Sequence, residues 1–253
     1  LPGAGEFIGS NHQRFSEQID LQLDSLRNLR FIDKKGNVTI DGEDALRTGL
    51  SRPEVARLLL DMMDKDPDLA ATYGAQTAAL LDRSSYLYQE SALKETYFSD
   101  LVQMWNTYIS LPEEDRQAYC AKNDIIQHEF DRAIKTAEGI RAEFPRQNFF
   151  GAGYIDYDKS VERRLTPLVV NCFFDNVCIR KNKNSPYKRV GFKGGSTLTP
   201  NKRLPDAFTC VKTIQIPRRG GRTIIPSIVF PLEKQDILSS RRKEVWTRRQ
   251  TIA

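Results

Sequence analysis

One stretch decides the fold class of this chain: Thr209-Cys-Val-Lys-Thr-Ile-Gln-Ile216, then Pro217-Arg-Arg-Gly-Gly-Arg222, then Thr223-Ile-Ile-Pro-Ser-Ile-Val-Phe230. The outer two segments are rich in β-branched residues, which favour strands, and the glycines between them are typical of a turn. The prolines restrict these strands to a sheet edge or to a small open barrel. We therefore predict a β-hairpin that carries arginines at its tip.

The residues before this hairpin predict further strands. Leu168–Phe174 and Val177–Arg180 are apolar runs separated by two turn-forming residues, so they predict a second hairpin. Tyr187–Phe192 predicts another short strand, and Gly194–Pro205 predicts a loop. The segment from Leu168 onward is thus expected to be strand-rich up to the end of the Thr223–Phe230 strand.

The first 145 residues have a different pattern, in which apolar residues recur every three or four positions and predict helices. The predicted helical segments are Phe15–Leu29, Pro53–Met63, Asp66–Leu81, a segment around Leu93–Tyr108, a short helix from Pro112, and one from Asn123 or Asp124 to Phe144. Ser51 and Glu54 have the spacing of a capping box at the start of the second helix. Between the first two helices, Lys34-Lys-Gly-Asn37 predicts a hairpin turn.

These patterns predict an α+β protein in which a helical bundle is followed by a small antiparallel sheet or open barrel and a C-terminal helix, Leu232–Gln250. Residues 1–10 have the composition of a cloning-derived extension and are set aside. The predicted organisation is an acidic helical bundle at 11–146, a glycine- and aromatic-rich linker at 147–160, and a basic strand-rich domain at 161–253.

Charge is divided unevenly between the two parts. From Ser160 onward the chain has 20 lysines and arginines against 6 acidic residues, whereas the residues before it have 18 against 27. A basic segment of this kind indicates a polyanionic partner, namely nucleic acid, an anionic lipid surface or an acidic protein. The other interpretation is that the acidic and basic parts attract each other.

The basic residues gather at predicted strand ends and loops, and two aromatic residues lie among them. Phosphate contacts by lysine and arginine give affinity without sequence preference, and aromatic rings stack on unpaired bases. The candidate nucleic-acid-binding residues are Arg180, Lys181, Lys183, Tyr187, Lys188, Arg189, Phe192, Lys193, Lys202, Arg203, Arg218, Arg219 and Arg222.

Three other motifs are weaker indications of function. Asp33–Asp44 follows the pattern of a calcium-binding EF-hand loop in part, but Lys35, Val38 and Asp44 replace a ligand, the turn glycine and the bidentate glutamate. Leu50–Leu60 has the pattern of the first helix of a helix-turn-helix, but no basic recognition helix follows it. Gly191–Ser196 could form a backbone nest for phosphate, yet it lacks the spacing of a Walker loop.

The residues that most often do chemistry are few. There are only two histidines, His12 and His128, so no histidine-based triad or two-histidine metal site can be assembled. The four cysteines are scattered and form no CxxC pair, which is typical of reduced thiols, although a disulfide of Cys172 with Cys178 is conceivable. We therefore expect no cofactor and no metal, and we favour a protein without enzyme activity.

The function predicted from the sequence is that of a cytoplasmic, non-enzymatic protein that holds a nucleic-acid backbone on a basic C-terminal sheet, the nucleic acid being single-stranded or RNA. The alternative is an interaction, assembly or secreted regulatory protein. In that case the helices would bind a protein partner, and the basic region would contact anionic lipid or acidic protein.

Overall fold

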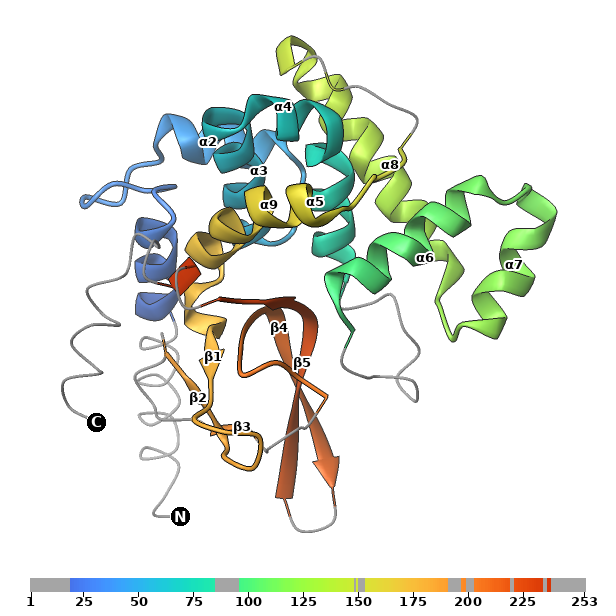
Figure 1. The fold of residues 1–253 in the computed structure, drawn as a ribbon. Coiled ribbons are helices and arrows are strands. Elements are labelled where there is room, and N and C mark those ends of the chain that lie inside the picture. Colours follow the sequence, from blue (N-terminus) through green and yellow to red (C-terminus); the bar gives the residue numbers. More distant parts are fainter. Residues whose placement is uncertain are drawn as a thin grey trace, which may run out of the picture.

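The computed structural model describes residues 19–84, 96–147, 149, 153–190, 197–198, 203–218, 221–233 and 236–237. It confirms the predicted α+β class: a helical bundle formed by the first part of the chain lies on one side of the molecule, and a small antiparallel sheet lies on the other (Figure 1). The predicted C-terminal helix lies almost entirely outside the described residues.

The chain enters the described part in a helical segment, 19–28, which falls within the predicted Phe15–Leu29 helix. The hairpin predicted at Lys34–Asn37 is confirmed, because Ile32 and Val38 form an antiparallel bridge across it. Helix α2 (Ile40–Arg47) follows directly, with the Thr39 side chain accepting a hydrogen bond from the Gly42 amide. A Cβ at Gly42 would lie 2.2 Å from the Phe31 carbonyl oxygen, so glycine lets the helix pack against the hairpin.

The bundle proper begins with helix α3 (Pro53–Lys65), at the proline that predicted its start. The capping box predicted there is wrong: Arg52 is the N-cap residue, and the carboxylate of Asp82 accepts hydrogen bonds from the Ser51 and Arg52 amides, each at 3.0 Å. A residue distant in sequence therefore holds the backbone just before this helix, which has no side-chain cap of its own.

The remaining helices of the bundle agree with the predicted series in order and approximate position. They are α4 (Pro67–Leu69), the π-helical turn η1 (Ala70–Gly74), α5 (Ala75–Arg83), α6 (Phe98–Ser110), α7 (Glu113–Lys122), α8 (Gln127–Glu143) and the 3₁₀ turn η3 (Pro145–Gln147). Helix α8 begins later than predicted, because Asp124 has a φ of 55°, which is incompatible with the helix.

One predicted element is wrong. Leu168–Phe174 was expected to be a strand, but Lys159–Cys172 forms helix α9 and Phe174–Asn176 a 3₁₀ turn, η4. Asp158 caps this helix by accepting a hydrogen bond from the Val161 amide at 2.8 Å. The apolar run is buried on a helix face, and a short apolar run does not by its periodicity distinguish a buried helix from a strand.

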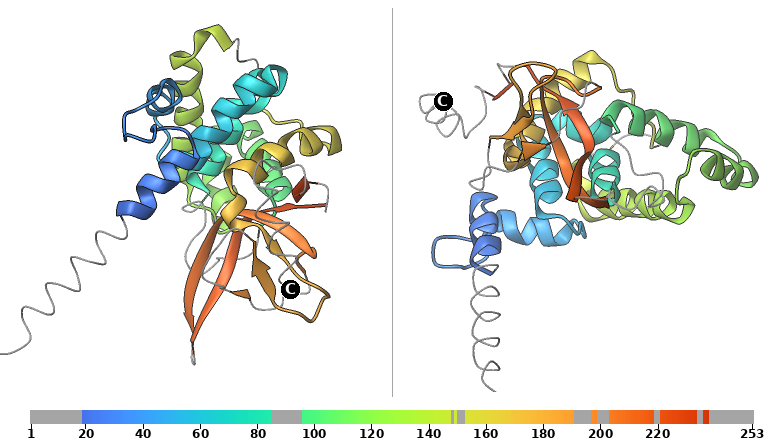
Figure 2. Two further views of the ribbon diagram at one scale, coloured as in Figure 1. Left: turned by 90° about the vertical axis from the view of Figure 1, so that its left-hand side faces the viewer. Right: turned by 90° about the horizontal axis from the view of Figure 1, so that it is seen from below.

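Within the described residues the sheet has five strands in the order β3-β2-β1-β4-β5, all of whose pairings are antiparallel. The strands are β1 (Cys178–Ile179), β2 (Tyr187–Arg189), β3 (Thr197–Leu198), β4 (Ala207–Arg218) and β5 (Gly221–Pro231). Strand β3 lies within the segment predicted as a loop. The long β4–β5 hairpin is the one predicted from Thr209–Phe230, and its end projects away from the bundle (Figures 1 and 2).

The core runs from the bundle into the sheet. Val211, Ile228 and Phe230 from the long hairpin belong to the same buried cluster as the helical residues Leu101 and Trp105. The ring of Phe98 at the start of α6 stacks on Phe230 with the centroids 4.8 Å apart. The boundary predicted at 147–160 therefore falls between two parts that pack together, and the division into two domains stays a prediction.

Candidate nucleic-acid interface

The structure divides the predicted basic residues into those that build the sheet and those that face solvent. Arg180, at the end of β1, belongs to the first kind, with a side chain only 1% exposed. It donates hydrogen bonds to the Asp206 carboxylate at 2.8 Å and the Leu204 carbonyl at 2.7 Å. Its guanidinium also lies 4.7 Å from the ring centroid of Tyr187. Arg180 thus ties two loops of the sheet together and offers no free face to a phosphate.

Tyr187 was predicted to stack on a base, and the structure corrects this role. Its side chain is fully buried, and its ring meets that of Phe208 edge to face at 5.1 Å. The hydroxyl donates to the carbonyls of Leu204 and Pro205, which lie 3.1 and 3.0 Å away. Burial raises the pKa of this hydroxyl to about 12. Tyr187 is therefore part of the core of the sheet.

Arg189 is likewise engaged in the fold. Its Nη2 donates to the Asn176 side chain at 2.6 Å and its Nε to the Asp175 carbonyl at 3.2 Å, which joins β2 to the η4 turn. Because Tyr187 and Arg189 are two residues apart on β2, they point to the same face of the sheet, while Lys188 points to the other. The Lys188 side chain is exposed at this edge of the sheet, although its cross-strand neighbour Ile179 packs against a buried cluster.

Three lysines remain exposed in this region, and we call Lys181, Lys183 and Lys188 the lysine group. Lys181 and Lys183 flank Asn182, whose side-chain oxygen accepts hydrogen bonds from the Asn184 amide and the Ser185 hydroxyl, each at 3.0 Å. This turn orders the β1–β2 loop. Within the described part of the chain, no acidic side chain pairs with the lysine group.

Three further basic features are found elsewhere on the sheet and its loops. Arg203 is exposed, and its carbonyl accepts a hydrogen bond from the Tyr97 hydroxyl at 2.9 Å. Lys212 is also exposed, and it lies on β4 opposite Ser227. Sequence reasoning missed this residue, because its only signal is a lysine among the apolar residues of a strand. At the end of the long hairpin the backbone of Arg218 pairs with Gly221 and that of Arg222 with Pro217.

Four predicted residues, Phe192, Lys193, Lys202 and Arg219, lie outside the described residues. The predicted phosphate nest at Gly191–Ser196 lies there as well. The described part of the candidate interface thus consists of the lysine group, Arg203, Lys212 and the backbone that carries Arg218 and Arg222.

The cysteines of the sheet do not add chemistry to this surface. All four cysteines are free and buried, so the conceivable disulfide of Cys172 with Cys178 is not formed. Burial raises the pKa of the Cys178 thiol to about 12 and that of Cys210 well above its usual value. These thiols stay protonated at neutral pH and behave as core residues. Among the described helices, none combines the length and apolar character needed to cross a membrane.

Comparison with known proteins finds structures with a similar fold but does not identify a family. No protein-family model and no curated protein sequence matches this chain. Among solved structures, the DExH-box NTPase HrpB of Escherichia coli matches with a TM-score of 0.51 and 15% identity over 85% of this chain. A second crystal structure, described as the Escherichia coli DEAH/RHA helicase HrpB, has a TM-score of 0.49 and 14% identity over 84% of this chain.

The similarity covers only part of those proteins. In both cases the matched region is 21% of the HrpB chain, so this chain spans about a fifth of their length. At such low identity, the first match shows that the arrangement of helices and sheet occurs in a segment of a larger protein.

Proposed function

We propose that this protein binds nucleic acid without catalysis, by holding the phosphate backbone on the basic surface of its sheet. The observation that carries the proposal is the lysine group: three exposed lysines on one loop and its neighbouring strand, without acidic partners among the described residues. The basic charge of the segment from Ser160 onward supports the same proposal.

The character of the surface indicates what kind of binding to expect. Tyr187 is buried, so the aromatic ring predicted on β2 does not stack on bases. Lysine contacts phosphates as a point charge, without reading the sequence. We therefore propose binding that depends on charge and on salt concentration and is insensitive to base sequence. That HrpB is described as a helicase is compatible with a nucleic-acid-binding role, which we extend to this chain only as part of the proposal.

The test is a salt titration of binding to a labelled oligonucleotide, with two multiple variants. In the first, Lys181, Lys183 and Lys188 become Gln; in the second, Arg218, Arg219 and Arg222 become Ala. Each lost phosphate contact lowers the slope of log affinity against log salt by about 0.7 for single strands and about 0.9 for duplex. We expect the lysine-group variant to reduce the slope by about 2 and the hairpin variant to reduce it further.

A matched control removes lysines from the acidic bundle. Lys122 on α7 and Lys135 on α8 are both exposed, so a Lys122→Gln/Lys135→Gln protein compares directly with Lys181→Gln/Lys183→Gln. If both pairs change the affinity equally, the effect is one of net charge and the sheet is not the binding surface. If binding is undetectable at low salt, nucleic acid is excluded, and flotation with acidic liposomes then tests the lipid alternative.

A further inference from the structure

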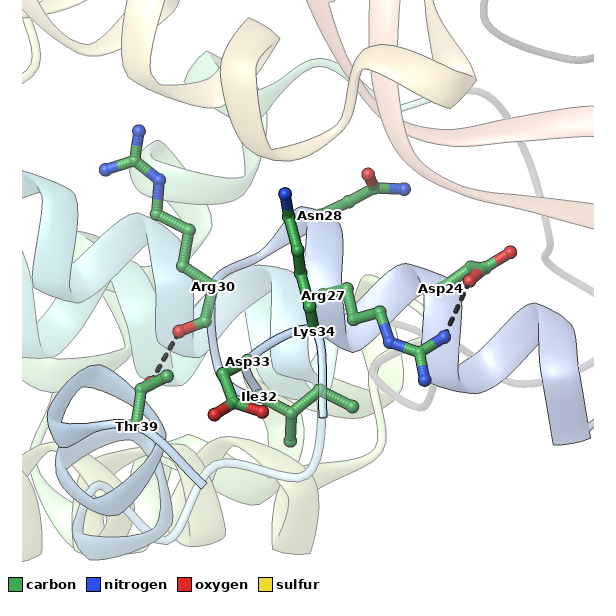
Figure 3. A pocket seen from close by; sticks show the side chains of 8 residues that line it. All are labelled: Asp24, Arg27, Asn28, Arg30, Ile32, Asp33, Lys34 and Thr39. Carbon is green, nitrogen blue, oxygen red and sulfur yellow. Dashed lines mark hydrogen bonds and ion pairs between the residues drawn. The ribbon is translucent and has the colours of Figure 1, made fainter. Parts of the chain in front are cut away.

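A hollow of about 720 Å³ lies near the start of the described chain, between the helical segment 19–28 and the hairpin that follows it (Figure 3). It is lined by Asp24, Arg27, Asn28, Arg30, Ile32, Asp33, Lys34 and Thr39. None of these residues belongs to the candidate nucleic-acid interface. The volume is in the range of sites that hold small molecules.

Arg30 occupies an unusual position at the edge of this hollow. The Arg30 amide donates to the Arg27 carbonyl at 3.0 Å and the Phe31 amide to the Leu26 carbonyl at 2.9 Å, which is the Schellman arrangement at a helix end. The central residue of this motif must adopt the left-handed conformation, and Arg30 does so with a φ of 64°. Glycine usually holds this position, because other residues are strained there.

The charges around the hollow leave two cations uncommitted. Asp24 forms an ion pair with Arg27 at 2.9 Å. Asp33 accepts hydrogen bonds from the Lys35 amide at 2.7 Å and from the amide and side chain of Asn37 at 2.9 and 3.0 Å, so its carboxylate serves the hairpin turn. In contrast, the described residues offer no ion-pair partner to the side chains of Arg30 and Lys34.

The close-up view shows how these groups are directed. Arg30, Lys34 and Asn28 extend toward the same side, with the Lys34 ammonium lying between the Arg30 guanidinium and the Asn28 amide in this projection (Figure 3). The Arg27 side chain turns aside to Asp24, and the Asp33 carboxylate lies on the opposite side. Arg30 and Lys34 both line the hollow, and in this view both side chains extend away from the Asp33 carboxylate.

We propose that this hollow binds the dianion of a phosphate monoester on a small molecule. A monoester carries close to two negative charges at neutral pH, which match the two uncommitted cations, whereas a carboxylate or a backbone phosphodiester carries one. Arginine offers a fork of donors and lysine a point charge, and Asn28 adds an amide donor. Ile32 provides an apolar wall for the organic part of the ligand. A strained arginine is kept where glycine would serve the fold because its guanidinium binds this ligand.

The decisive variant is Arg30→Gly, since loss of binding in it has no explanation in misfolding. Glycine relieves the left-handed strain, so we expect the melting temperature of the ligand-free protein to rise by about 2–4 °C. At the same time, the affinity for adenosine 5′-monophosphate and for inorganic phosphate, measured by NMR titration at pH 7.5, should fall at least about tenfold. Lys34→Gln should lower the affinity to a similar extent without raising the melting temperature.

Two controls separate this site from other sources of binding. The protein with Lys181, Lys183 and Lys188 changed to Gln should bind adenosine 5′-monophosphate like the wild type, whether or not the sheet binds nucleic acid. Adenosine 3′,5′-cyclic monophosphate, a diester with one charge, should bind at least about fivefold more weakly than the monoester. The proposal is overturned if the wild type shows no binding of either phosphate probe, if Arg30→Gly binds them unchanged, or if the diester binds equally well.

Discussion

At the scale of single residues, Tyr187 shows why a sequence pattern does not settle a role. An aromatic residue among lysines and arginines is what a base-stacking surface needs, and it is also what a small sheet needs in its core. In Tyr187-Lys188-Arg189 the alternation shows that Lys188 faces away from its two neighbours, but not which face is covered by the rest of the protein. The covering loop, which contains Leu204 and Pro205, is distant in sequence.

Replacing Tyr187 with Phe tests the structural role. The change removes the hydroxyl donor from the Pro205 carbonyl, whereas the Leu204 carbonyl keeps its hydrogen bond from Arg180, so we expect the free energy of unfolding to fall by about 1–2 kcal/mol in urea titrations. Nucleic-acid affinity should stay within about twofold of the wild type, because the ring is buried. A large loss of affinity with unchanged stability would restore the stacking role.

The pKa of Tyr187 adds a dependence on pH. Burial raises it from 10.0 in the unfolded chain to about 12 in the fold. A group whose pKa is raised by folding contributes stability below its unfolded pKa and loses that contribution as the pH rises through the folded value. The stability difference between the wild type and Tyr187→Phe should therefore be constant below pH 10 and shrink between pH 10 and 12. A constant difference up to pH 12 would contradict the buried hydroxyl.

At the scale of elements, the helix starts marked by proline could be predicted, whereas interactions between distant residues could not. Pro53 and Pro67 each lie at the first position of a helix, since their fixed φ suits it. The start of α3 is different: Ser51 and Glu54 have the local pattern of a capping box, but the Ser51 and Arg52 amides donate to Asp82 at the end of α5. A local rule has no access to a residue that only the tertiary fold brings near.

The contribution of Asp82 can be measured against that of Glu54. Asp82 is 1% exposed and accepts from both amides and from the Ser51 hydroxyl, so Asp82→Ala should lower the free energy of unfolding by about 2–4 kcal/mol. Glu54→Ala is the matched control and should change it by less than about 0.5 kcal/mol. Urea unfolding of the two variants beside the wild type decides the matter: an equal loss in both would show that the capping box is real.

At the scale of the whole molecule, the class of fold and the charge division were accessible from the sequence, because both are sums over many residues. The secondary structure of Leu168–Phe174 was not accessible in this way. An apolar run of this length is buried both as a strand and as a helix, and only its packing in α9 distinguishes the two. The uncommitted cations of the hollow at Arg30 were also invisible. Their significance depends on Asp24 and Asp33 being occupied elsewhere, which only the structure shows.

The division in charge suggests two domains, but the packing argues for one cooperative unit. Phe230 of β5 is 1% exposed, stacks on Phe98 of α6 and belongs to the main core cluster together with helical residues. Removing its ring leaves a cavity against the bundle and should cost about 3–5 kcal/mol of unfolding free energy. If the bundle and the sheet unfold together, both lose this unfolding free energy.

Native-state hydrogen exchange can follow the two parts separately in a Phe230→Ala protein, since α5 lies in the bundle and β4 in the sheet. We expect the slowest-exchanging amides of both elements to lose the same free energy of protection, because the only opening that exposes them is global. If α5 keeps its wild-type protection while β4 loses it, the bundle folds alone. The boundary predicted at 147–160 would then be a true domain boundary, and the basic sheet could be separated from the bundle for binding studies.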